Sequence, residues 1–238
     1  MQANHLVVGL IVARGGGSTL YRKNAYVIHG KPVLQWAIEI MQRAGFISTV
    51  FVWTEDAELA QITRDAGAVA LERPRDMVHH YSGNCHLGEW YRLQTEQIQE
   101  HLGRNYDFIV PFNCNCICFQ PESLRTMYAT LRDGGPNALR IQAVGRLPGG
   151  LCLENPLNGR LYPFWTDTEK KLDANPPLYR MIGVTIVNRH VPNSGNVITL
   201  HHEVSPREGF DFQNVDDIPY AQYYLQKQTK TAPGRACL

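Results

Sequence analysis

The stretch HLVVGLIVARGGGSTLYRKN, residues 5–24, decides the fold. Its first part, Leu6–Val12, is short, apolar and rich in β-branched residues, which predicts a fully buried strand. Three consecutive glycines follow at 15–17, and a glycine run exposes backbone N–H groups and lets a ligand approach closely. Basic residues stand on both sides of the glycines and indicate that the ligand is an anion: Arg14, Arg22 and Lys23.

Strand and helix patterns alternate outward from this stretch. A first-turn proline, an apolar stripe and a final glycine predict a helix over 32–45. Further strands are predicted at 49–54, 68–71, 107–112, 139–144, 183–188 and 211–213, and further helices at 56–66, 87–102, 121–131 and 216–226. This alternation predicts an α/β fold with a mostly parallel, Rossmann-like sheet that helices cover on both faces.

Length and composition indicate one cytoplasmic domain over residues 1–228. Residues 149–178 are rich in proline, glycine and asparagine and predict an extended excursion, and 229–238 predict a frayed tail. The net charge of +1 argues against nucleic-acid binding. No apolar run approaches the ~20 residues of a membrane helix. The N-terminus lacks the basic region of a signal peptide, and six cysteines are too few for a disulfide scaffold, which indicates a reducing compartment.

A glycine loop between a strand and a helix is typical of nucleotide binding. The glycines are contiguous, so the dinucleotide pattern GxGxxG is absent, and no Gly-Lys-Ser/Thr completes a Walker loop. A merely flexible turn is the alternative that the loop alone leaves open.

Ala13-Arg-Gly-Gly, Arg22-Lys-Asn24 and Gly30-Lys-Pro-Val33 together resemble the nucleotide loop of the cytidylyltransferases that make CMP-activated acid sugars, the acylneuraminate or CMP-sialic acid synthetase-like enzymes. Later segments resemble this family in the same order and cover nearly the whole chain: VFVWTEDAELAQITRDAGAVALERP (50–74), FIVPFNCNCICFQPESL (108–124), IGVTIVN (182–188) and GFDFQNVDDIPYAQYYL (209–225). The resemblance implies a sheet of the nucleotide-diphospho-sugar transferase (GT-A-like) type. It also implies CMP transfer from CTP to the hydroxyl of a sialic-acid-like or other 2-ulosonic sugar, with release of pyrophosphate, and a homodimer in which the excursion reaches the partner's site.

The resemblance assigns roles to particular residues. The expected catalytic residues are Arg14, Lys23 and Asp211, and the expected nucleotide-binding residues are Ala13, Arg14, Gly15, Gly16, Lys23, Asn24, Arg73 and Ser82. Backbone amides and cations suit this chemistry, because catalysis of phosphoryl transfer is mostly positioning and charge neutralisation. Asn113 is expected to face the acceptor, and Asp211 and Asp217 to hold Mg²⁺, which prefers hard oxygen ligands. Ordinary loop or strand-end roles are the alternative for the polar residues, and helix capping is the alternative for Asp217.

The chain departs from the family pattern at three places. Ser18 stands where a lysine is expected, Tyr21 where a proline is expected, and Gln213 where the middle aspartate of the metal segment is expected. An active enzyme with an unusual acceptor, such as a phosphonate, is one explanation, and a degenerate paralogue that binds nucleotide without turnover is another. A glycosyltransferase is a third, but Asp211-Phe-Gln213 is a poor metal dyad for that class and lies too late in the chain.

Cys114, Cys116 and Cys118 alternate along a strand-like segment. Zinc sites use short spacers at a tight knuckle, so we interpret these cysteines as small buried apolar residues. The pairs His79–His80 and His201–His202 are interpreted as polar loop residues.

Overall fold

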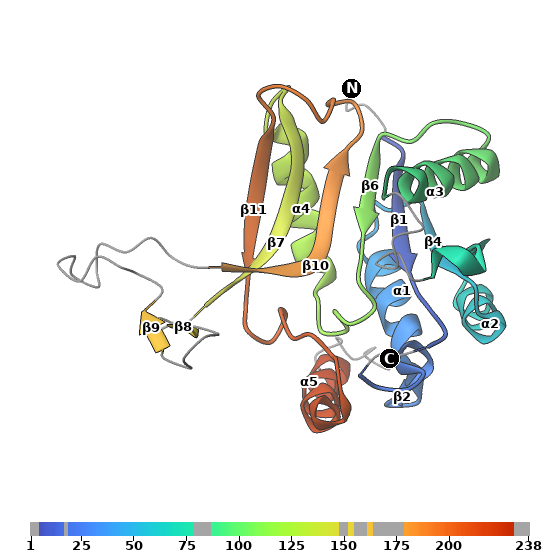
Figure 1. Ribbon diagram of the computed structural model, residues 1–238, viewed down its shortest axis with the longest axis vertical. Helices are drawn as coiled ribbons and strands as arrows, with labels where there is room; N and C mark the ends of the chain where they lie inside the picture. The colour runs from blue at the N-terminus through green and yellow to red at the C-terminus, as the bar shows by residue number, and fades with distance from the viewer. Residues whose placement is uncertain are drawn as a thin grey trace, which may run out of the picture.

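A seven-stranded sheet organises the protein in the computed structural model, which describes residues 5–16, 19–78, 87–147, 152–154, 161–163 and 179–230. The strand order is β11-β7-β10-β6-β1-β4-β5 (Figure 1). The strands are β1 (Val7–Val12), β4 (Thr49–Thr54), β5 (Val69–Glu72), β6 (Phe108–Pro111), β7 (Ala138–Arg146), β10 (Tyr179–Asn188) and β11 (Ile198–Val204). Only β10 among these runs antiparallel to its neighbours, so the expected mostly parallel α/β sheet is confirmed.

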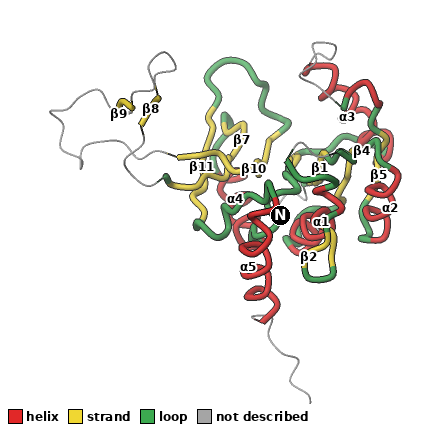
Figure 2. Tube along the Cα trace, turned by 60° about the horizontal axis from the view of Figure 1, so that its bottom comes forward, coloured by secondary structure: helices red, strands yellow, loops and turns green. Residues whose placement is uncertain are grey.

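Helices cover both faces of the sheet (Figure 2). They are α1 (Val33–Arg43), α2 (Ala57–Asp65), α3 (Leu87–Leu102), α4 (Pro121–Asp133) and α5 (Ile218–Lys230). Alternate residues of β1 enter two different apolar clusters: Val7 and Ile11 pack with residues of α1 and α4, and Val8 and Leu10 pack with Ile98 of α3. Burial on both faces explains why β1 is a continuous apolar run rather than an alternating one.

Local signals set the helix ends. Pro32 precedes α1, where a missing N–H costs nothing, and Gly45 follows it with φ +78°, the left-handed conformation that stops a helix. Asp56 begins α2 because its side chain accepts the Leu59 N–H at 3.0 Å.

Two expectations about the C-terminal part are wrong. Residues 211–213 form no strand; they run as irregular chain between β11 and the short 3-10 helix η4 (Val215–Asp217). Helix α5 ends at Lys230, two residues into the segment 229–238 that is predicted as a frayed tail, and residues 231–238 lie outside the described residues. The edge strand β11, which contains His201 and His202, was not expected, so these histidines lie on a strand and not in a loop.

The expected excursion lies largely outside the described residues. Within it, β8 (Cys152–Glu154) and β9 (Leu161–Pro163) pair as antiparallel strands. A second small hairpin joins β2 (Val27–Ile28) to β3 (Lys31–Pro32) just before α1. In the part of the chain that the structure describes, no helix has the length and apolar character needed to cross a bilayer.

Candidate functional site

The strand order reverses direction at β1. From β1 the chain proceeds to β4 and β5 on one side, and then returns to place β6 on the other side of β1. In open α/β sheets, ligands bind outside the carboxyl ends of the strands at such a reversal. The segments at this point are the glycine loop, which follows β1 directly, and the Asn113–Asn115 segment, which follows β6. The topology therefore brings the predicted nucleotide loop to the edge at which such sheets bind ligands.

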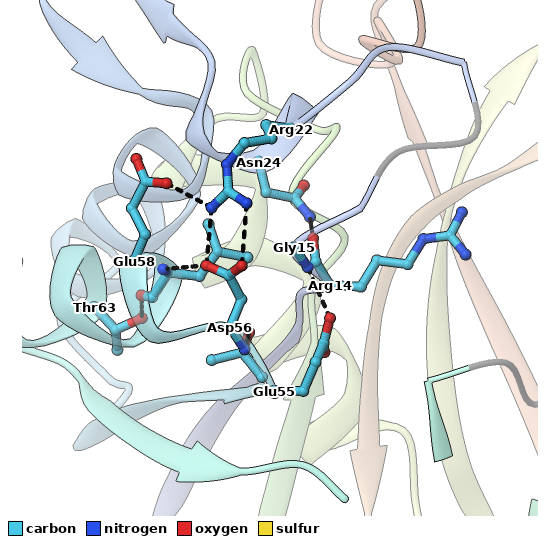
Figure 3. Close-up of polar contacts among 10 residues, drawn as sticks. Arg14, Gly15, Arg22, Asn24, Glu55, Asp56, Glu58 and Thr63 are labelled. Carbon is cyan, nitrogen blue, oxygen red and sulfur yellow. Dashed lines mark hydrogen bonds and ion pairs between the residues drawn. The ribbon is translucent and has the colours of Figure 1, made fainter. Parts of the chain in front are cut away.

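Gly15 is packed against the start of α2 (Figure 3). Its N–H donates to Glu55 Oε1 at 2.8 Å, and a Cβ at this position would lie 2.2 Å from Asp56 Oδ2. Gly16, in contrast, is exposed, and an added Cβ would meet no atom within 4 Å. The close approach of Asp56 therefore explains one of the glycines, and the Gly15 amide already has an acceptor.

Arg22 fastens the loop to the same helix. Its backbone is left-handed, with φ 50° and ψ 36°, and its guanidinium donates to Asp56 Oδ1 at 3.0 Å and Oδ2 at 3.2 Å and also contacts Glu58. Burial raises the pKa of the Asp56 carboxyl, but the hydrogen bonds from Arg22 and the Leu59 N–H more than offset this and hold the pKa below its usual value. The sequence showed Arg22 as a basic residue of the loop but gave no sign of its partner.

Asn24 and Arg14 are also brought together. The Asn24 side chain is buried, and its Nδ2 donates to the Arg14 carbonyl at 3.0 Å. The Arg14 side chain points away from the carboxylates of Asp56 and Glu55 (Figure 3). Ala13 is fully buried, and its N–H donates to the Trp53 carbonyl at 3.1 Å, so it ties the start of the loop to β4.

Lys23 connects the glycine loop to the distant 211–213 segment. Its ammonium donates to Gln213 Oε1 at 2.9 Å, and Gln213 Nε2 donates to Asp211 Oδ2 at 2.8 Å. The Thr19 hydroxyl donates to the Gln213 carbonyl. Burial lowers the pKa of Lys23 below its usual value, while Asp211 opposes this and the like charge of Arg14 adds to it. Two expected catalytic residues are therefore joined through the glutamine that departs from the family pattern.

The two expected metal ligands differ in what their carboxylates already bind. Asp211 Oδ1 is buried and has no hydrogen-bond partner among the described residues. Asp217 Oδ2 instead accepts the N–H groups of Gln213 at 2.7 Å and Asn214 at 2.9 Å, in a capping box at η4. Among the described residues, no group of three or more His, Cys, Asp or Glu side chains is placed to hold a metal ion. Of the two expected ligands, Asp211 is the one with a carboxylate oxygen left over, which suits the binding mode in which Mg²⁺ takes one carboxylate plus substrate phosphates.

Arg73 lies in a buried position. Its guanidinium stacks near the Trp53 and Trp90 rings, 5.1 and 5.5 Å from their centroids. It also donates to the Met77 carbonyl at 2.6 Å and the Val78 carbonyl at 3.1 Å. These contacts hold the chain that leads into residues 79–86. Ser82, His79 and His80, like Ser18, lie outside the described residues.

The end of β6 presents two asparagines. Asn113 is exposed and its Oδ1 accepts the Asn115 N–H at 3.3 Å, so the expected acceptor residue is accessible. Asn115, which is not among the predicted site residues, is buried, and its carbonyl accepts the Phe212 N–H at 3.1 Å. That bond holds the residue next to Asp211 against the end of β6. Its only sequence signal is a polar residue amid buried cysteines.

The cysteines of this segment are buried, as expected. Burial raises the pKa of the Cys114, Cys116 and Cys118 thiols to about 12, so they remain protonated at neutral pH. They pack as small apolar residues in the core.

Comparison with known proteins gives a likeness in structure but not in sequence. No protein-family model matches the chain, and no curated protein matches it in sequence. A CMP-2-keto-3-deoxy-manno-octonic acid synthetase, solved in complex with CTP, superposes with a TM-score of 0.65 at 15% identity, over 94% of this chain and 99% of that one. A 4-diphosphocytidyl-2C-methyl-D-erythritol synthase from Anaerococcus prevotii gives 0.62 at 10% identity, over 94% and 99% of the two chains. Another synthase of that name gives 0.65 at 13% identity, over 93% and 98%. The chain therefore has the fold of these cytidylyltransferases over nearly their whole length.

Proposed function

We propose that this protein is a cytidylyltransferase, which transfers CMP from CTP to the hydroxyl of an acidic acceptor and releases pyrophosphate. One observation carries the proposal. The Lys23–Gln213–Asp211 chain joins the glycine loop to the 211–213 segment at the reversal of strand order. Cations and a carboxylate with an unpartnered oxygen thus meet at the expected ligand edge. The fold shared with enzymes named for CTP and cytidyl products supports the choice of nucleotide.

Charge neutralisation is the main task of these residues. Burial and, to a smaller degree, the like charge of Arg14 lower the pKa of Lys23, so an anion bound beside Lys23 offsets both effects. The triphosphate is such an anion, and the same two cations stabilise the pyrophosphate as it departs. Asn24 fixes the Arg14 backbone and Arg22 fixes the loop conformation just before Lys23, which sets the geometry in advance.

Mg²⁺ belongs to the proposal through Asp211. Its buried Oδ1 is the oxygen that would hold the ion, and when bound, Mg²⁺ neutralises negative charge on the triphosphate. Asp217 contributes as the cap that keeps the 211–213 segment in place rather than as a direct ligand. The proposed acceptor is a sialic-acid-like or other 2-ulosonic sugar, with Asn113 facing it, and the proposed assembly is a homodimer.

A second function is favoured by Gln213. Its neutral side-chain amide donates to Asp211 Oδ2 and accepts from Lys23 Nζ. A metal ion at Asp211 therefore meets one carboxylate whose second oxygen is already hydrogen-bonded, and no second carboxylate at position 213. A nucleotide-binding protein without turnover would fit that arrangement.

The test measures CTP binding by titration calorimetry, and pyrophosphate release with CTP, Mg²⁺ and a panel of acidic sugars and phosphonates. Lys23→Ala is expected to weaken CTP binding at least tenfold, whereas Arg132→Ala, which removes a cation paired with Asp133 at the end of α4, leaves it unchanged. Asp211→Asn is expected to weaken the binding of Mn²⁺ in the presence of CTP, measured by electron paramagnetic resonance. Asp216→Asn is the control and should leave Mn²⁺ binding unchanged. Binding without release on the whole panel supports the second function, and no CTP binding contradicts both.

A further inference from the structure

Two carboxylate oxygens among the described residues are buried without a hydrogen-bond partner, Asp211 Oδ1 and Glu55 Oε2. Both lie at the ligand edge of the sheet, and the proposed function uses only the first. A buried carboxylate oxygen that accepts nothing is costly, and such a group calls for an explanation. Glu55 therefore needs a role of its own.

The position of Glu55 restricts what that role can be. It is the first residue after β4, the strand next to β1, and its Oε1 accepts the Gly15 N–H at 2.8 Å. This bond directs the carboxylate to the glycine loop (Figure 3). In dinucleotide-binding βαβ units, an acidic residue downstream of the glycine loop accepts hydrogen bonds from ribose hydroxyls. The unit β1–loop–α1–β4 of this chain places Glu55 at an equivalent point.

The negative charge of Glu55 disfavours a phosphate group beside its carboxylate. A phosphate offers only acceptor oxygens and negative charge, so Glu55 repels it, and the Gly15 amide that could have bound it is occupied. The cations lie elsewhere: the Arg14 side chain points away from Glu55 (Figure 3), and Lys23 points to Gln213. These charges favour one orientation of a bound nucleotide, with its phosphates near Arg14 and Lys23 and its uncharged nucleoside near Glu55.

We infer that Glu55 is a specificity-determining residue that accepts a hydrogen bond from an N–H or O–H donor of the nucleoside. This inference rests on the proposed function and adds to it the orientation of the nucleotide. Two groups of CTP have the required chemistry, the exocyclic amine of cytosine and the ribose hydroxyls. Both are neutral donors, so the carboxylate distinguishes them from the phosphates by charge and by hydrogen-bond direction.

The experiment compares dissociation constants of CTP, UTP, 2′-deoxy-CTP and 3′-deoxy-CTP, by calorimetry, for the wild type, Glu55→Gln and Glu72→Gln. In Glu55→Gln the side-chain oxygen can still accept the Gly15 N–H, but the second acceptor becomes a donor. Glu72→Gln makes the same charge change at the exposed end of β5. Thermal unfolding checks that each variant folds.

We expect Glu55→Gln to bind CTP about tenfold more weakly, the range of one hydrogen bond to a charged group, with Glu72→Gln unchanged. We also expect the wild type to prefer CTP over one analogue and Glu55→Gln to lose that preference. Loss toward UTP identifies the amine, and loss toward a deoxy analogue identifies the hydroxyl. If the wild type binds CTP and Glu55→Gln keeps every preference of the wild type, the inference is overturned while the proposed function stands. A wild type that binds no CTP overturns the proposed function as well.

Discussion

Replacing Gly15 by alanine tests whether the glycine is required by packing. The added Cβ would lie 2.2, 2.7 and 2.8 Å from Oδ2, Cγ and Cβ of Asp56, which Arg22 and the Leu59 N–H hold in place. Either the loop shifts, at the cost of about 1–3 kcal/mol that overpacking incurs, or Asp56 moves and α2 loses a cap of about 1 kcal/mol. We expect Gly15→Ala to lower the free energy of unfolding by about 2 kcal/mol and the Tm by roughly 4–8 °C.

Urea and thermal unfolding measure this loss, with Gly16→Ala as the matched control. The neighbouring glycine is exposed and has open space at its Cβ position, so its replacement should leave the stability unchanged or slightly higher. In an Asp56→Gly background all three of these atoms are absent, and Gly15→Ala should then cost less than about 0.5 kcal/mol. Equal losses for the two glycines, or the same loss with and without Asp56, would refute the packing argument.

Two further predictions concern carboxylates. Asp217→Ala removes the acceptor of two backbone N–H groups at η4. Losing a cap of about 1 kcal/mol should lower the Tm by about 2–4 °C in thermal unfolding, whereas Asp216→Ala should change the Tm little. Equal effects of the two substitutions would contradict the capping role of Asp217. The pKa of Asp56 is lowered in the folded state, so its stabilisation is complete above the usual carboxyl pKa of about 4 and is lost as the pH falls through the lowered value. Between about pH 6 and pH 3 the Tm of Asp56→Asn should therefore fall less than that of the wild type, and parallel pH profiles would exclude this linkage.

Local patterns predicted most of the fold because they report burial directly. In β1 and α1 the spacing of the apolar residues matches the faces that each element buries, so the pattern within each element is enough to identify it. The edge strand β11, with the sequence ITLHHEV, was missed because its residues are mostly exposed and little apolar periodicity remains. Residues 211–213 are predicted as a strand and form none: Phe212 packs in the core from irregular chain, where its N–H donates to the Asn115 carbonyl.

The site was predictable in its residue types and not in its pairings. The motif drew attention to Lys23 and Asp211, but not to the amide of Gln213 that joins them. In the same way, the glycine at position 15 suggested an open amide, while the carboxylate of Glu55 that binds this amide comes 40 residues later. Such contacts depend on which strand ends the topology brings together, which no local pattern contains.

Arg22 and Lys23 are consecutive, yet their side chains bind residues that lie far apart in the sequence, Asp56 and Gln213. The partner of Arg22 lies 34 residues away, and that of Lys23 lies 190 residues away. During synthesis, the glycine loop can therefore dock on α2 early, whereas its second anchor forms only after β11 and the 211–213 segment have emerged. A chain that stops before residue 213 would contain all seven strands of the main sheet but would hold the glycine loop on one side only, so we expect it to lack the proposed nucleotide binding.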